Sequence, residues 1–490
     1  MQLSRRDLAV HGASVLALVV VAMVLRYPTS LAPGLVPCDT NTDLHVLLAS
    51  ALSEGSFGHV ELLNHPEGVD MRMVALPLML LAALLQPLGS VAGFHLAVML
   101  WLVLNGVGLL WVGGRLGLDR AGALALAITC LVGTQTLSFL GSGQYENVVP
   151  LAFGVVLLAT QQASTWRACA LFAGSLFVSG FCSPYQAISV GLVGAGAALF
   201  SVGPRPLLAM ALAGAVSLLP VAAYYASATE GPLGPAPALI IEALEFSLPQ
   251  LQHRELISVV GLPYHGDLEL PPLPNRGVGW VLPIAGVASF FALRKAGRPL
   301  AAGAVLVLLA ALGPSIYLGF VTLPGPWALA MRLPGLGDMS AICRLGTGLS
   351  FVLALAVLRA WPTRWVAIGL PLAVAIETFL FSPGIWPVRA GWIGEVALDQ
   401  PVGFYPSPPF ASSDPSEWIA VAHGVPVAWS PPPDGDMRAW LGELRAQEID
   451  RVVIHHGLVR LPRELSDCLE PLESLGERTT IYAIGCSGER

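Results

Sequence analysis

The feature that most constrains this chain is a series of apolar segments, each about long enough to cross a lipid bilayer. Because a bilayer core requires about 20 apolar residues per helix, we predict about eleven transmembrane helices. Only 12% of the residues are charged, whereas soluble domains carry about 25%. The sequence therefore predicts an all-α polytopic membrane protein. The predicted spans are 8–26, 92–113, 121–140, 148–163, 168–182, 186–202, 207–226, 278–293, 299–320, 346–361 and 365–382.

The distribution of basic residues predicts how these helices are oriented. Lys and Arg concentrate in short loops on the cytoplasmic side of a membrane. If the short apolar run 73–88, which contains Pro77 and Pro87, does not cross, 11 basic residues lie on one side. We therefore predict the N-terminus inside and the C-terminus outside, with 73–88 as a juxtamembrane or re-entrant helix on the outer face. The 11 residues are Arg5, Arg6, Arg115, Arg120, Arg167, Arg205, Arg294, Lys295, Arg298, Arg359 and Arg364.

Two domains follow from this topology. Residues 1–382 form the transmembrane domain, whose first external loop, 27–91, is large. Residues 383–490 form a small extracytoplasmic α/β domain, because a helical stretch and two alternating, strand-like stretches follow a Pro-rich start. This segment holds 8 Lys or Arg against 15 Asp or Glu, so no basic field indicates nucleic acid. The three stretches are 437–447, 451–456 and 479–486.

Two cysteines of the C-terminal domain form a further pattern. Cys468 and Cys486 could form a disulfide if this domain faces an oxidising compartment, or they could both remain thiols. The spacing of the seven cysteines in the chain does not match a metal-binding motif.

The first loop contains a polar stretch, 36–71, that is too rich in ionisable groups to lie in lipid. Asp39 and Asp43 are four residues apart, so they would share one face of a helix. Two such carboxylates can act as a general base and its electrostatic partner, or they could bind a divalent cation. Alternatively, Asp39 caps a helix that starts after it.

Three other polar groups lie on the predicted outer side. The turn 141–147 presents hydrogen-bonding side chains that suit a sugar, or that cap the neighbouring helices. Arg332 and Arg344 lie on the side that usually lacks arginine, and guanidinium groups pair well with a lipid phosphate or with nearby headgroups. Glu377, inside the last span, is a candidate for function or for a bond to a neighbouring helix. The candidate side chains of the turn are Gln144, Tyr145 and Glu146. A further run, 65–71 of the first loop, contributes His65, Glu67 and Asp70.

Several of these segments, taken in order, resemble the GT-C superfamily of prokaryotic multi-pass membrane glycosyltransferases. The similar pieces include CDTNTDLHVLLASALSEG, LLNHPEGVDM, FLGSGQYENVVPLAF, EFSLPQLQHRELISVVGLPYHG and RLPGLGDMSAICRLGTGLSFVLALAVL. The resemblance covers most of the chain and rests on hydropathy and short landmarks. It implies an enzyme of the bacterial inner membrane whose active face is extracytoplasmic and whose donor is a sugar on a polyprenyl phosphate.

The resemblance also implies roles for individual residues. Asp39 would be the general base that deprotonates an acceptor hydroxyl, and Asp43 would position the acceptor or tune the base. Arg344 and Arg332 would bind the lipid phosphate. The residues that would line the sugar pocket are His65, Glu67, Asp70, Gln144, Tyr145 and Glu146.

Two other functions compete with this interpretation. A transporter or flippase would be expected to carry internal repeats and acids within several spans, and the sequence shows one such acid and no clear repeat. A non-catalytic GT-C-like scaffold, acting through its C-terminal domain, is the third alternative.

Overall fold

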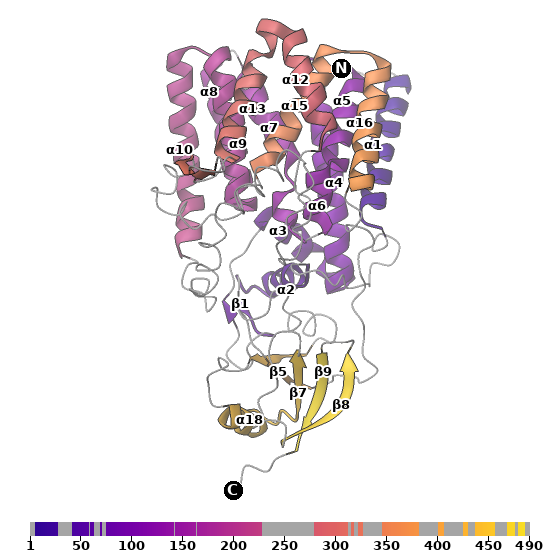
Figure 1. Ribbon diagram of the computed structural model, residues 1–490, viewed down its shortest axis with the longest axis vertical. Coiled ribbons are helices and arrows are strands. Elements are labelled where there is room, and N and C mark those ends of the chain that lie inside the picture. The colour runs from indigo at the N-terminus through magenta and orange to yellow at the C-terminus, as the bar shows by residue number, and fades with distance from the viewer. Residues whose placement is uncertain are drawn as a thin grey trace.

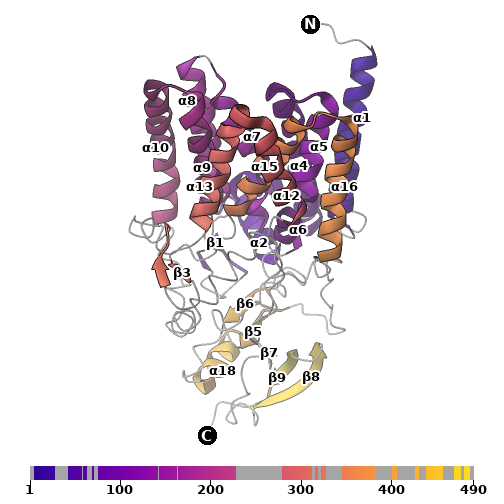
Figure 2. The ribbon, with the colours of Figure 1, turned by 45° about the horizontal axis from the view of Figure 1, so that its top comes forward.

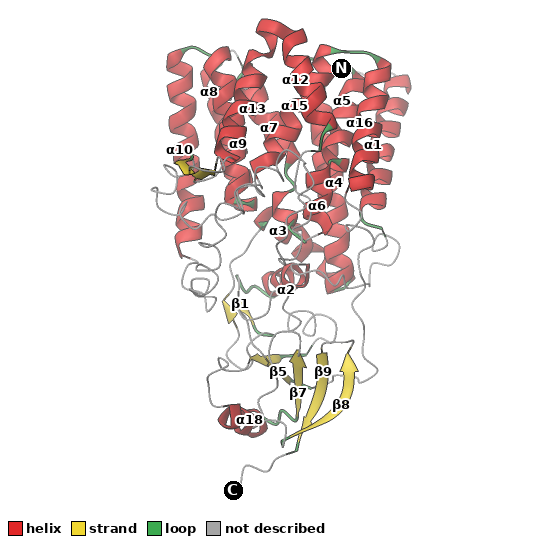
Figure 3. Ribbon diagram, viewed as in Figure 1, coloured by secondary structure: helices red, strands yellow, loops and turns green. Residues whose placement is uncertain are grey.

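The computed structural model consists of a helical bundle with a small β-sheet beyond one end (Figure 1). Helices dominate the bundle, and the longer strands collect in the C-terminal part (Figure 3). The structure describes residues 5–27, 42–57, 59–62, 69–70, 75–141, 143–162, 164–227, 279–311, 315–317, 322–326, 345–381, 400–405, 425–429, 437–455, 468–475 and 479–485.

The apolar segments form the helices of the bundle, because a helix satisfies its own backbone hydrogen bonds where lipid offers none. Each of the eleven predicted spans overlaps a helix. Among the described residues, three helices are long and apolar enough to cross a membrane by length and composition, or four if one bent pair is a single span. The number of spans therefore remains a prediction. The bundle helices are α1 (Arg5–Leu25), α4 (Ser90–Arg115), α5 (Arg120–Val132), α6 (Thr134–Gly141), α7 (Pro150–Ala159), α8 (Thr165–Cys182), α9 (Pro184–Ser201), α10 (Pro204–Ser227), α12 (Val281–Leu293), α13 (Arg298–Ala311), α15 (Gly346–Ala360) and α16 (Arg364–Phe381).

Two predicted spans differ from the structure. The span 121–140 is broken at Gly133, where α5 and α6 meet at an angle of 42°. The span 299–320 is too long, because α13 ends at Ala311 and a hairpin of β3 (Ser315–Tyr317) and β4 (Thr322–Pro324) follows. A 20-residue hydropathy average detects neither change, because it includes the apolar residues that flank each site.

The first external loop contributes short elements between α1 and α4. They are α2 (Thr42–Ser53), β1 (His59–Val60), β2 (Val69–Asp70), α3 (Leu76–Leu85) and the 3₁₀ turn η1 (Gln86–Leu88). The apolar run 73–88 thus forms a helix of 10 residues, which at 1.5 Å per residue covers about half of a bilayer core. Leu78, Met79 and Ala82 of this helix are buried.

Basic residues border the connections at the end of the bundle that faces away from the β-sheet. The turns from α4 to α5, from α12 to α13 and from α15 to α16 all lie there (Figure 2). The connection from α12 to α13 is the 3₁₀ turn η3 (Arg294–Gly297). Arg359 at the end of α15 donates to the carbonyl oxygen of Leu116 after α4, with its Nε 3.1 Å away. This bond ties two of the turns together.

The C-terminal domain is a five-stranded sheet with the strand order β6-β5-β7-β9-β8. Strand β5 runs parallel to both of its neighbours, whereas β9 runs antiparallel to both of its own. The prediction of α18, β7 and β9 is correct to within one or two residues, but the sequence analysis missed β5, β6 and β8. The elements are β5 (Val402–Tyr405), β6 (Val427–Trp429), α18 (Met437–Ala446), β7 (Arg451–His455), β8 (Leu469–Leu475) and β9 (Thr479–Ile484).

The two faces of this sheet pack against different partners, because successive side chains of a strand point to opposite faces. Val452 and Ile454 pack with Trp440, Leu441 and Leu444 of α18. The other face carries Val402, Phe404, Val427, Val453 and Ile481, which belong to the same apolar core as the bundle.

A backbone hydrogen bond also joins the C-terminal sheet to the first loop. The N–H of Val427, in the edge strand β6, donates to the carbonyl oxygen of Leu62 at 2.8 Å. Leu62 lies just after β1, so the sheet holds the part of the first loop that lies next to α2. Figure 1 shows β1 and α2 between the bundle and the sheet.

Candidate functional site

Tyr145 lies at the centre of a buried polar cluster at the end of the bundle that faces the C-terminal sheet. Only 1% of Tyr145 is exposed. Its hydroxyl accepts a hydrogen bond from Arg26 NH1 at 3.1 Å and lies 2.7 Å from Thr42 Oγ1. The 3₁₀ turn η2 (Tyr145–Asn147) is thereby joined to the end of α1 and to the start of α2.

Arg26 supplies the fixed positive charge of the cluster, although it is only 1% exposed. Its NH2 lies 2.7 Å from Nδ1 of His95, a residue of α4. Because a guanidinium can only donate, this contact leaves Nδ1 of His95 as the acceptor and places its ring proton on Nε2. The guanidinium carbon also lies 5.3 Å from the centre of the Tyr145 ring, where the ring electrons attract a cation.

Glu146 supplies the negative charge and is 8% exposed. Its Oε1 accepts from Asn147 Nδ2 at 3.0 Å, and its Oε2 lies 3.7 Å from His45 Nε2. Asn147 Oδ1 in turn accepts from Ser183 Oγ at 3.1 Å. The chain of contacts therefore runs from α2 through η2 to the junction between α8 and α9.

Aromatic rings separate this cluster from water. The ring of His45 meets Tyr145 edge-on with the ring centres 5.4 Å apart, and Phe94 meets Tyr145 at the same separation. In such surroundings charges interact more strongly than in water, and an uncompensated charge is costly. The hydrogen bonds that Arg26 and Glu146 make within the cluster therefore offset the cost of burying these groups.

Local sequence explains why η2 adopts its position. Gly143 has φ +66°, a conformation that glycine adopts at little cost, and it turns the chain after α6. Pro150 occupies the first turn of α7, where its missing N–H removes no hydrogen bond. From α4, Trp101 Nε1 donates to the carbonyl oxygen of Val148 at 2.8 Å, which fixes the end of η2.

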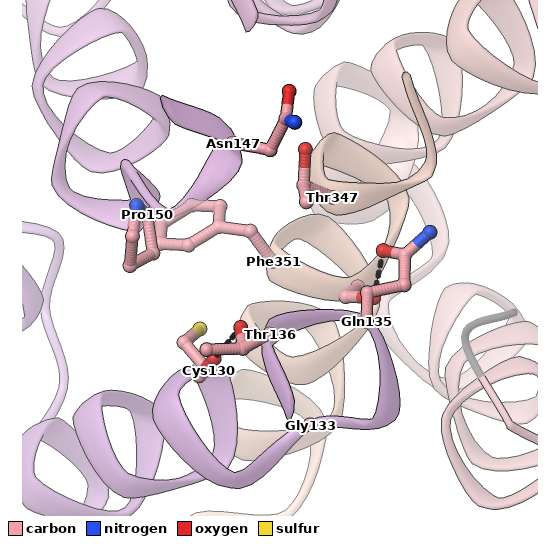
Figure 4. Close-up of a pocket in the computed structure, with 9 residues that line it drawn as sticks. Cys130, Gly133, Gln135, Thr136, Asn147, Pro150, Thr347 and Phe351 are labelled. Atoms are coloured by element: carbon pink, nitrogen blue, oxygen red, sulfur yellow. Dashed lines mark hydrogen bonds between the residues drawn. The ribbon is translucent and has the colours of Figure 1, made fainter. Parts of the chain in front are cut away.

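A narrow pocket adjoins the cluster on the bundle side and shares Asn147 with it (Figure 4). Its polar lining is uncharged. Within it, Ser350 Oγ donates to Gln135 Oε1 at 3.1 Å, and Thr136 Oγ1 donates to the carbonyl oxygen of Cys130 at 2.7 Å. The lining residues are Cys130, Gly133, Gln135, Thr136, Asn147, Pro150, Thr347, Ser350 and Phe351.

Glu377 in α16 is also buried, and its environment differs from that of Glu146. It accepts from the backbone N–H groups of Trp280 and Val281, with its Oε1 3.2 Å from the Val281 nitrogen. These N–H groups open α12, where the first four donors have no partner within the helix. The expectation that Glu377 bonds a neighbouring helix is correct, and its role there is that of a cap.

Five of the predicted site residues fall outside the described residues: Asp39, His65, Glu67, Arg332 and Arg344. Asp43 belongs to the first turn of α2, and Asp70 ends β2, paired with His59. The structure brings Gln144, Tyr145 and Glu146 together as one buried segment, and the described contacts of Tyr145 and Glu146 are to other protein groups. Their contact with a sugar remains a prediction.

Several residues of the cluster are absent from the set that the sequence predicted, among them Arg26, Thr42, His45 and His95. Arg26 offered a signal, because it ends the first apolar segment on the side where arginine is unusual. The sequence contained no signal for His95, since a single histidine in an apolar helix can be structural as well as functional. Among the described residues, no group of three or more His, Cys, Asp or Glu side chains could hold a metal ion. Binding of a divalent cation by Asp39 and Asp43 stays a prediction, because Asp39 lies outside the described residues.

Neither a protein-family model nor a curated protein matches the chain. Among solved structures, it is similar to the arabinofuranosyltransferase AftD from Mycobacteria, with 16% identity, 100% of this chain and 40% of that chain covered, and a TM-score of 0.48. It is similar to ArnT from Cupriavidus metallidurans, with 12% identity, 96% and 97% covered, and a TM-score of 0.49.

A third similar structure is the oligosaccharyltransferase from Archaeoglobus fulgidus, with 13% identity, 91% and 69% covered, and a TM-score of 0.43. The chain spans 40% of the length of AftD. At such identities and TM-scores the similarities carry no argument about donor, acceptor or mechanism, and those come from the residues of this chain.

Proposed function

We propose that the chain is a membrane glycosyltransferase that transfers a sugar from a polyprenyl-phosphate donor to a hydroxyl of an envelope glycan, lipid or protein. The reaction would take place at the extracytoplasmic face of the bacterial inner membrane. The observation that carries this proposal is the buried cluster of Arg26, Tyr145, His45 and Glu146, in which His45 belongs to the first-loop helix α2.

The cluster supports the proposal because it holds the first residue of α2, which follows the predicted base closely in the sequence. Thr42, the first residue of α2, lies 2.7 Å from the Tyr145 hydroxyl, and Asp39 precedes it by three residues in the sequence. A base must be held in place relative to the reacting atoms, since small displacements cost large factors in rate. Arg26 and Tyr145 would act as positioning residues for this segment.

The proposed chemistry is an inverting displacement at the anomeric carbon of the donor. Asp39 would take the proton of the acceptor hydroxyl while its oxygen forms the new glycosidic bond. The bond between the anomeric carbon and the phosphate oxygen breaks, and the polyprenyl monophosphate leaves with the electron pair. Arg344 and Arg332 would balance the negative charge of this leaving group.

Sugar transfer from radiolabelled polyprenyl-phosphate hexoses, measured with purified protein in liposomes, tests the proposal. We expect Asp39→Asn to lower the transfer rate at least about 100-fold, the usual contribution of a general base. Glu54→Gln is the matched control, because Glu54 is an exposed acid of the same loop and its substitution should leave the rate unchanged.

Two outcomes would contradict the proposal. Full activity in Asp39→Asn would exclude Asp39 as the base. Movement of the intact donor lipid between leaflets without sugar transfer would instead favour the flippase alternative.

A further inference from the structure

The turns between α4 and α5 and between α15 and α16 lie at the end of the bundle farthest from the C-terminal sheet (Figure 2). A cavity of about 130 Å³ lies between them. The charged and polar side chains in its lining are Arg359, Asp119 and Thr363, beside the indole of Trp361. The cavity shares no residue with the buried cluster around Tyr145 or with the pocket beside it.

Arg359 brings a positive charge into this cavity that its protein contacts do not neutralise. In the part of the chain that the structure describes, its hydrogen bonds go to one acceptor, the carbonyl oxygen of Leu116. A carbonyl group accepts hydrogen bonds but carries no net charge. A partly buried guanidinium in this situation favours an anionic partner, because its own solvation is incomplete.

Asp119 brings a negative charge into the same cavity. Its Oδ1 accepts from the N–H of Gly122 at 2.7 Å and so caps α5, which leaves lone pairs of the carboxylate for a further donor. Between the described residues, Asp119 and Arg359 form no ion pair within 4.0 Å, although both line one cavity. A ligand that carries both a negative and a positive charge would complement both groups at once.

The surroundings of the cavity indicate where such a ligand comes from. On α16, Trp365 and Ile368 are 84% and 62% exposed, as expected for side chains in contact with lipid. Tryptophan is enriched where lipid headgroups meet the hydrocarbon region, and Trp361 lines the cavity at that level of the bundle. The cavity therefore opens where a phospholipid headgroup would lie.

We propose that this cavity binds the zwitterionic phosphoethanolamine headgroup of a membrane phospholipid. Its phosphate pairs with the guanidinium of Arg359, and its ammonium group pairs with the carboxylate of Asp119. The Thr363 hydroxyl is a further donor to the phosphate. The site is independent of the proposed transferase chemistry and lies at the other end of the bundle.

Native mass spectrometry of the full chain, released from detergent with defined lipids, tests this site. We expect wild-type protein to retain phosphatidylethanolamine at least 10-fold more than phosphatidylglycerol at equal concentrations. Arg359→Gln should lose this retention at least 10-fold, whereas Arg298→Gln should behave as wild type. Arg298 is the matched control because it is an exposed arginine at the same end of the bundle, outside the cavity.

A second variant keeps the test decisive if Arg359→Gln fails to fold. Asp119→Asn preserves the cap of α5, since Asn is as good a capping residue as Asp, and removes only the charge. We expect this variant to keep a bound lipid but to lose the preference for phosphatidylethanolamine. An unchanged preference in Asp119→Asn, or equal retention of both lipids by wild type, would overturn the proposal.

Competition with soluble glycerophosphoethanolamine distinguishes the two sources of this headgroup. We expect no displacement at concentrations equal to that of the lipid, because the acyl chains hold the lipid against the exposed face of α16. Complete displacement under these conditions would overturn the assignment to a membrane lipid.

Discussion

Two buried glutamates in the described part of the bundle, Glu146 and Glu377, illustrate how the same side chain serves different purposes. Both are less than 10% exposed, and both lie next to the start of a helix. Glu377 contacts backbone N–H groups that no rotation can remove. Glu146 instead contacts the side chains of Asn147 and His45.

This difference indicates which acid is available for chemistry. A carboxylate held by backbone amides at a helix start compensates partial charges that exist in every state of the protein. A carboxylate paired with an imidazole can exchange charge or proton with it, as reaction intermediates require. We therefore assign Glu377 to stability and Glu146 to the proposed site.

The largest expected effect on the rate of sugar transfer is that of neutralising Glu146, and the same substitution at Glu377 is its comparison. Glu146→Gln should lower sugar transfer about 100-fold, because it removes a charge from the site while its amide can still accept from Asn147. Glu377→Gln should change the rate per folded molecule by less than about twofold, since Glu377 accepts from backbone N–H groups at the start of α12. The transfer assay checks both, and equal losses in the two variants would break the distinction.

A second prediction concerns the stability that Glu377 provides. Gly279 precedes α12 with φ +76°, and a Cβ added there would collide with the Glu377 carboxylate. We expect Gly279→Ala to destabilise the protein by about 2 kcal/mol or more, from the left-handed backbone and the collision together. Thermal unfolding in detergent measures this change.

Gly369→Ala provides the control for that measurement. Gly369 lies in α16, the helix that carries Glu377, and a Cβ there would meet nothing within 4 Å. Because alanine is the better helix former, this variant should be as stable as wild type or slightly more so. Equal destabilisation by both substitutions would mean that the contact with Glu377 is not the cause.

The smallest expected effect is that of the Tyr145 hydroxyl. Tyr145→Phe keeps the ring and removes the hydroxyl that contacts Arg26 and Thr42. We expect the free energy of unfolding to fall by about 1–2 kcal/mol and the rate of sugar transfer to decrease. Tyr27→Phe, at a tyrosine that is 50% exposed, should change neither. A normal transfer rate in Tyr145→Phe would show that this hydroxyl does not position the start of α2.

Hydropathy predicted the helices well because it averages over about 20 residues, and lipid contact imposes such a length. The same averaging hid the break at Gly133 and the end of α13 at Ala311. The sequence did not predict strands β5 and β6, because they are 4 and 3 residues long and lie in Pro-rich sequence. Their pairing is determined by distant strands rather than by their own residues.

The candidate site was predictable only in part. Gln144, Tyr145 and Glu146 were found because three polar residues interrupt apolar sequence. Arg26 was not predicted, because its hydrogen bond is to Tyr145, which is 119 residues away along the chain. A single sequence records which residues are present but not which distant residues meet.

The hydrogen bond between Val427 and Leu62 has a consequence for biosynthesis. Its two residues are 365 positions apart (427 minus 62). At the usual rate of roughly 5–20 residues per second, a ribosome needs roughly 20–70 seconds to make the chain between them. The first loop is thus among the earliest segments synthesised, yet it gains its partner in β6 only when most of the protein exists. During that interval a chaperone or protease would encounter the loop without the sheet that later holds it.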